Sequence, residues 1–108
     1  MRFAEKRDFP AVRALWETCF PDEGGFNDYF FAHFYKEKYT LLYLEDETLV
    51  AMVQMLPYRM TVDGISRETT YIYGACTDPA HRRKGYMARL LERSFELDRE
   101  AGRIASVL

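Results

Sequence analysis

Cysteines are few in this sequence, and long apolar runs are missing. Its 108 residues include two cysteines, Cys19 and Cys76, which stand far apart and form neither a disulfide framework nor a metal-ligand spacing. No run of ~18 apolar residues occurs that would span a membrane, and residues 1–6 contain no apolar signal-peptide core. These absences predict a cytoplasmic protein in a reducing compartment, with no metal and no membrane partner.

An excess of positive charge is also missing. Lys and Arg total 15 against 17 for Asp and Glu, which gives a formal net charge of −2. General nucleic-acid binding depends on basic side chains that contact phosphates. The basic cluster His81-Arg82-Arg83-Lys84 is small and fits a solvated helix entrance, so we expect no nucleic-acid partner. With 48% hydrophobic and 30% charged residues, the chain is typical of one globular domain, residues 1–108.

The apolar pattern switches between helix-type and strand-type spacing along the chain. Val12, Leu15, Trp16 and Cys19 recur at three- and four-residue steps, as in an amphipathic helix. The predicted order is one strand, two helices, three antiparallel strands, a helix and a parallel strand, at residues 1–4, 8–20, 27–35, 39–44, 49–55, 68–77, 85–101 and 103–108. A right-handed crossover puts the last strand beside the strand at residues 68–77.

Turn chemistry adds detail to several of these elements. Asp63-Gly64 predicts a two-residue hairpin between the third and fourth strands. Pro57 should bend its strand or occupy a bulge, and Gly74 indicates a bulge or a close approach by another backbone. Asp8 is placed to cap the first helix, and Gly102 to stop the last one.

Two of the helices have distinctive side chains. The helix at residues 27–35 is rich in aromatic residues, most of which we expect to pack on the sheet. The last helix is expected to place Met87, Leu90, Leu91 and Phe95 on one side, opposite a charged face.

The strongest functional signal is the run from Tyr71 to Leu91, which predicts a strand, a polar loop and a helix. A helix N-terminus presents unpaired N–H groups and partial positive charge, so it binds anions. Arg82, Arg83 and Lys84 stand directly before this helix, and Gly85 lacks a Cβ that would hold a phosphate away from the backbone. The spacing matches neither a dinucleotide fingerprint nor a Walker A loop. We therefore expect a phosphate-bearing ligand here.

The same run resembles motif A of the GCN5-related N-acetyltransferase (GNAT) superfamily. That motif has Gln or Arg, two residues, Gly, one residue and then Gly or Ala, between the family's fourth strand and third helix. Arg82 and Gly85 match it, whereas Met87 stands where the family has Gly or Ala, and Ala88 follows. Within the superfamily the sequence is most similar to the bacterial subgroup of the enhanced intracellular survival protein, in which Leu56-Pro57-Tyr58 also has a counterpart.

The resemblance implies an N-acetyltransferase that moves an acetyl group directly from acetyl-CoA to a primary amine of a small molecule or peptide. It also implies a layered α/β/α fold, with a mixed, mainly antiparallel sheet and helices on both faces. The family's acceptor pocket borders the aromatic helix, so one or two of its rings should face substrate. Backbone amides would hold the thioester, the pantetheine arm and the pyrophosphate. The implied cofactor-binding residues are Ala75, Cys76, Thr77, Arg82, Arg83, Lys84, Gly85, Tyr86, Met87 and Ala88.

The resemblance covers only the front part of the family's domain. The closing strands and the last helix, which carries the usual tyrosine acid, have no counterpart in these 108 residues. We expect either a longer natural protein or a homo-oligomer. The homo-oligomer would pair through the edge of the strand at residues 103–108, because an unpaired strand edge favours hydrogen bonding to a strand of another chain. The 108 residues alone should bind cofactor weakly.

No side chain is marked out as the catalytic group. Glu68 and Tyr73 are the first candidates for base or acid, only because they lie on the strand before the loop. His81 fits an exposed turn histidine better than a general base, and Cys76 fits a small buried strand residue better than a nucleophile. The alternative to an enzyme is a non-catalytic CoA-binding or assembly module with the same fold.

Overall fold

Five strands form a single sheet in the computed structural model, which describes residues 1–21, 24–103 and 106–107. The strands are β1 (Arg2–Phe3), β2 (Thr40–Glu45), β3 (Thr48–Val62), β4 (Ile65–Thr77) and β5 (Ser106–Val107). They lie side by side in chain order, antiparallel from β1 to β4, and β5 runs parallel to β4. Within the described residues β5 pairs only with β4, and the homo-oligomer expected through this edge stays a prediction.

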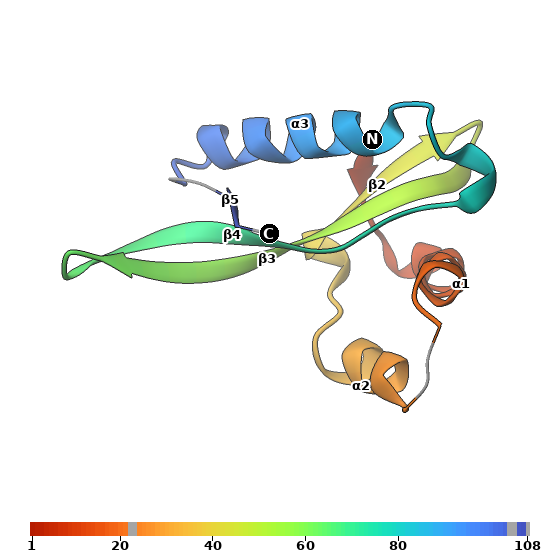
Figure 1. Ribbon diagram of the computed structural model, residues 1–108, viewed down its shortest axis with the longest axis horizontal. Coiled ribbons are helices and arrows are strands. Elements are labelled where there is room, and N and C mark those ends of the chain that lie inside the picture. Colours follow the sequence, from red (N-terminus) through yellow and green to blue (C-terminus); the bar gives the residue numbers. More distant parts are fainter. Residues whose placement is uncertain (22–23, 104–105, 108) are drawn as a thin grey trace.

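Helices cover both faces of the sheet (Figure 1). They are α1 (Phe9–Cys19), α2 (Phe26–His33) and α3 (Tyr86–Glu100), with short 3-10 turns at Lys6–Asp8, Glu37–Tyr39 and Pro79–His81. Figure 1 shows α3 along one face, with α1 and α2 on the other. The predicted α+β fold, with a mainly antiparallel sheet between helices, is confirmed. No helix in the described ranges is long and apolar enough to cross a bilayer.

The two faces of the sheet carry separate apolar cores. On one face, Val12, Trp16 and Phe30 of the helices pack against Leu42 and Met52 of the sheet. On the other, Leu90 of α3 packs against strand residues that include Leu41, Val53 and Met55. Neighbouring strand residues point to opposite faces, so consecutive apolar residues such as Leu41 and Leu42 serve both cores.

The hairpin of β3 and β4 is the longest feature of the sheet and extends past the end of α3 (Figure 1). Its turn is Asp63-Gly64, with φ of 51° and 77°, as the sequence predicted. The bulge considered at Pro57 was wrong, because Pro57 pairs with Thr70 without a shift in register, and the alternative of a bend stays a prediction. The pairing of β2 with β3 stops at Gln54, so Pro57 lies on an edge, where a missing N–H is tolerated.

The predicted irregularity at Gly74 is confirmed as a β-bulge. Gly74 and Ala75 together oppose Val53, and Gly74 has φ of +61°. The close approach comes from a side chain rather than from a backbone. A Cβ at Gly74 would lie 2.3 Å from Cζ3 of Trp16.

The indole of Trp16 is itself held firmly. Its Nε1 donates to Oδ1 of Asn27 at 2.7 Å, and its ring stacks on Phe30 with centroids 4.4 Å apart. Asn27, which is 2% exposed, donates in turn to the carbonyl of Phe20 at 3.0 Å. These contacts join the end of α1 to the start of α2 and press both against the bulge.

The sheet-facing side of α3 differs from the expected one. Phe95 is 39% exposed, whereas Ser94 and Asp98 are buried. Polar contacts explain the difference, because Thr70 donates to Oδ1 of Asp98 at 2.6 Å and Arg103 lies 3.3 Å from the same oxygen. A buried carboxylate with these partners holds the helix in a rotation that turns Phe95 towards solvent.

Gly102 ends α3 as expected. It has φ of 75°, and its N–H donates to the carbonyl of Arg99 at 3.1 Å. The N–H of Arg103 donates to the carbonyl of Asp98 at 2.9 Å, which completes a Schellman motif. This turn sends the chain back towards β4.

Asp8 precedes α1 as predicted, but its side chain does not cap the helix. Its two carboxylate oxygens accept from Arg2 at 2.7 and 2.9 Å, and one of them accepts from the Glu5 N–H. The hydrogen bond from Arg2 is the main reason that the pKa of Asp8 falls to about 2. Asp8 therefore ties β1 to the first turn of the chain.

The contact between Trp16 and Gly74 predicts an unequal response to two glycine substitutions. Gly74→Ala should lower the free energy of unfolding by about 3 kcal/mol, from a strained positive φ together with a clash against a packed ring. Gly64→Ala also places a side chain at a positive φ, but its Cβ would have nothing within 4 Å. This substitution should lower the free energy of unfolding by only about 1 kcal/mol. Urea denaturation of both variants measures the difference, and equal losses would contradict the close packing at the bulge.

Candidate cofactor and acceptor site

The N-terminus of α3 is open for an anion. Gly85, with φ of 79°, precedes the helix and has no side chain to cap it. Arg89 donates the first intrahelical hydrogen bond, to the carbonyl of Gly85 at 3.1 Å. The N–H groups of Tyr86, Met87 and Ala88 therefore lie before that bond and point out of the helix end. A Cβ at Gly85 would meet nothing within 4 Å, so the approach to these groups is clear.

Tyr86 fixes this helix end to the sheet. Its ring packs on Tyr43 with centroids 4.6 Å apart, and its hydroxyl donates to the carboxylate of Glu45 at the end of β2. The hydrogen bond to Glu45 is the first cause of a raised pKa for the phenol of Tyr86. The buried side chain of Tyr86 thus serves as an anchor, which leaves its N–H for a ligand.

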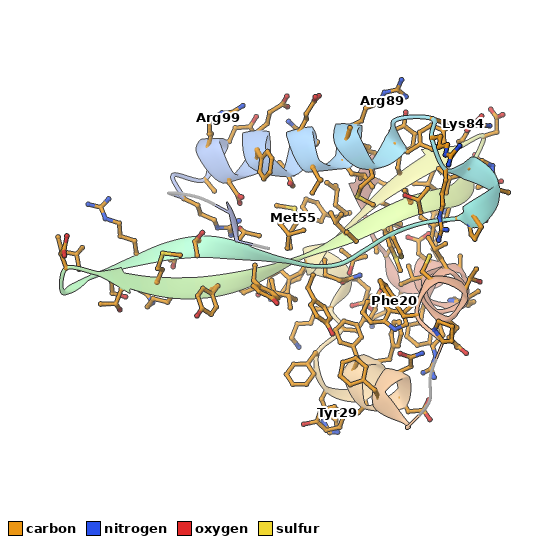
Figure 2. The ribbon with its side chains drawn as sticks, viewed as in Figure 1. Phe20, Tyr29, Met55, Lys84, Arg89 and Arg99 are labelled. Carbon is orange, nitrogen blue, oxygen red and sulfur yellow. The ribbon has the colours of Figure 1, made fainter. Side chains whose placement is uncertain are left out.

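The loop between β4 and α3 supplies the positive charge. Arg82, Arg83 and Lys84 are exposed, and Figure 2 shows Lys84 beside the N-terminal end of α3. The Nε of Arg82 lies 3.4 Å from the carbonyl of Thr77. Arg83 has a positive φ of 68°, which turns the chain into the helix. Charged side chains and helix N–H groups are combined at one end of α3, an arrangement suited to phosphate.

His81 in this loop is half-buried rather than exposed. Its Nδ1 makes no hydrogen bond and lies 3.9 Å from the nearer carboxylate oxygen of Asp78. The Asp78 carboxylate instead accepts from the N–H of Ala80 at 2.9 Å.

A cavity of about 280 Å³ lies between α1, the bulge and the loop. It brings together five of the residues that the sequence assigned to a cofactor, and two residues from the end of α1. The lining residues are Cys19, Phe20, Ala75, Cys76, Thr77, Arg82 and Met87. This cavity and the N-terminus of α3 are linked by Met87, which belongs to both.

A second cavity, of about 440 Å³, lies on the other side of the bulge. It is lined by Trp16, Phe20, Pro21, Gly24, Phe26, Asn27, Tyr73 and Gly74. Phe20 belongs to both cavities, and Gly74 of this one directly precedes Ala75 of the other. The two cavities therefore meet at the bulge of β4. Sequence reasoning missed Trp16 and Phe20 here, because their spacing is that of ordinary core residues.

The two catalytic candidates lie in different places. Tyr73 lines the larger cavity, and burial first and Tyr71 second raise the pKa of its phenol. Glu68 is exposed on the projecting hairpin, 3.4 Å from Arg59. Glu68 precedes Gly74 by six positions, which at ~3.3 Å per residue is about 20 Å along the strand. The structure does not bring Glu68 to either cavity.

A comparison with protein families identifies the family of this chain. The sequence model of the acetyltransferase (GNAT) domain matches residues 1–108. The chain belongs to this GNAT family. A search of curated proteins found no match.

Solved structures share the fold of this GNAT domain. A GCN5-related N-acetyltransferase from Anabaena variabilis is 14% identical with a TM-score of 0.87, over 97% of this chain and 27% of its own. Eis1 from Mycobacterium abscessus is 18% identical with a TM-score of 0.76, over 96% of this chain and 27% of its own. The aminoglycoside N-acetyltransferase AAC(6')-Iy in complex with CoA is 13% identical with a TM-score of 0.72, over 98% of this chain and 72% of its own. The GNAT domain thus spans about a quarter of the first two chains.

The open N-terminus of α3 predicts that charge at Gly85 controls phosphate binding. Gly85→Asp should weaken the binding of CoA at least roughly tenfold relative to Gly85→Asn, because only Asp adds a negative charge beside the expected pyrophosphate. Both side chains tolerate a positive φ, and both have open space at the Cβ, so both variants should fold.

Titration calorimetry with CoA measures the two affinities, and thermal unfolding checks the fold. Equal affinities in the two folded variants would contradict a pyrophosphate site at this helix end.

Proposed function

We propose that this GNAT domain transfers an acetyl group from acetyl-CoA to a primary amine by direct attack. The observation that carries the proposal is the meeting of the two cavities at the bulge of β4. One cavity continues to an anion-binding helix end, and the other is aromatic. A thioester at the bulge would be within reach of an amine entering from the opposite side.

The proposed cofactor site uses main-chain groups. The N–H groups of Tyr86, Met87 and Ala88 would bind the pyrophosphate, with Arg82 and Lys84 adding charge. The 280 Å³ cavity would take the pantetheine arm, and the N–H groups around the bulge would donate to the thioester oxygen. N–H groups that stabilise a developing oxyanion are worth about 3 kcal/mol each in known enzymes.

Proton transfer limits the proposed reaction at neutral pH. With a pKa of ~10.4, roughly one alkylamine in 2,500 is neutral at pH 7, so the acceptor must lose a proton before attack. The raised pKa of Tyr73 keeps its phenol protonated, so Tyr73 is a candidate to donate a proton to the leaving thiolate and not to accept one from the amine. We retain Tyr73, and not Glu68, as the candidate catalytic residue.

The lining of the larger cavity favours an acceptor with an apolar or aromatic body. Trp16, Phe20, Phe26 and Tyr73 supply rings, and the side chain of Asn27 is engaged by Trp16 and the Phe20 carbonyl. None of the described lining residues carries a charge. These described residues would favour a ligand that buries apolar area against their rings.

The finer grouping is also a proposal. We infer a relationship to the subgroup of the enhanced intracellular survival protein from Leu56-Pro57-Tyr58 and from the strand, loop and helix of motif A. The fold of Eis1 is compatible with it.

The proposed activity predicts saturable binding and turnover. Titration calorimetry should show binding of acetyl-CoA, and a thiol-release assay should show CoA production that depends on an added primary amine. Binding without thiol release across aromatic and aliphatic amines would favour a non-catalytic CoA-binding module, in which Met87 fills a position that is small in the family. No binding at millimolar acetyl-CoA would contradict both.

The aromatic cavity predicts a position-specific effect within α2. Phe26→Ala should raise KM for an arylalkylamine about tenfold, because it removes an aromatic wall of the cavity. Tyr29→Ala is the matched control, since Tyr29 is 53% exposed, against 51% for Phe26, and does not line the cavity. Figure 2 shows Tyr29 on the outer side of α2. Steady-state kinetics measures both, and an equal change in KM would contradict acceptor binding in this cavity.

A further inference from the structure

The two cysteines of the chain meet in the smaller cavity. Cys19 is the last residue of α1, and Cys76 follows the bulge on β4. Both line the 280 Å³ cavity, and both are free thiols. Cys19 also packs against the apolar cluster that contains Cys76. Two residues that are remote in sequence therefore line the same cavity.

The two thiols differ in accessibility. Cys76 is 5% exposed, and burial, followed by the neighbouring Cys19, raises the pKa of its thiol. Cys19 is half-buried, and its Sγ lies 3.4 Å from the carbonyl of Thr77. An external reagent would thus reach Cys19 before Cys76.

We propose that Cys19 and Cys76 form a reversible disulfide across this cavity, by exchange with a low-molecular-weight disulfide. The thiolate of Cys19 attacks one sulfur of the reagent, which forms a mixed disulfide and releases one thiol. The thiolate of Cys76 then attacks Sγ of Cys19 and releases the second thiol. The two cysteines lose two protons and two electrons in total, and the reagent is reduced to two thiols.

The disulfide would change the cavity directly. An S–S bond of ~2.05 Å would join the end of α1 to the part of β4 that follows the bulge. The two sulfur atoms would then be held in fixed positions on the wall of the cavity. If this cavity takes the pantetheine arm, which rests on the proposed function, oxidation blocks cofactor binding and reduction restores it.

The test begins with the thiol chemistry, which does not require enzyme activity. The reduced chain is treated with oxidised glutathione, and its intact mass is measured without reductant. We expect a loss of two hydrogen atoms and no retained glutathione. Trypsin should then release one linked pair of peptides, residues 14–36 and 68–82, each with a single cysteine. Retained glutathione without a linked pair, or a linkage between two chains, would overturn the proposal.

Calorimetry with acetyl-CoA then tests the effect on the cavity. Oxidation should weaken binding by the wild-type chain roughly tenfold or more, and dithiothreitol should reverse the loss. The matched control is Cys19→Ser, in which the affinities before and after the same treatment should agree. A linked pair with unchanged affinity would overturn the blocking effect. If the reduced chain does not bind acetyl-CoA, the proposed function fails, while the linked peptides still decide the thiol pairing.

Discussion

The indole of Trp16 lying against Gly74 is the contact on which the rest of the structure depends. Glycine is required there twice, for its positive φ and for the space that the ring occupies. Asn27 and Phe30 hold the ring from α2, so one side chain aligns two helices with the bulge of β4. Both cavities take their position from this alignment, because they adjoin consecutive residues of the bulge.

Features that depend on neighbouring residues were predictable from the sequence. The Asp63-Gly64 turn requires positive φ at both positions, and glycine with aspartate supplies it locally. Gly74 indicated a bulge because a strand interior rarely gains from glycine. The strand, basic loop and helix at residues 71–91 were equally local, since N–H groups at a helix end need no distant partner.

Features that depend on distant residues were not predictable. Pro57 is accommodated without a bulge because the pairing with β2 does not extend past Gln54, which no local pattern records. On α3, Asp98 faces the sheet and Phe95 faces solvent. The reason is that Asp98 is bound by Thr70 and Arg103, which lie outside this helix. Cys19 and Cys76 line one cavity because α1 packs against β4, and their separation in the sequence gave no sign of this.

In the proposed cofactor site the N-terminus of α3 would bind its ligand through backbone N–H groups rather than side chains, and this has a consequence for divergence. Substitutions in the loop change the surroundings of the N–H groups without removing them, so the ligand-facing surface tolerates drift. We expect substitution to be restricted instead at a few positions with a positive φ, such as Gly74 and Gly85. A domain built in this way can keep its architecture after most of its residues have been replaced, which agrees with the low identity between this chain and the solved structures that share its fold.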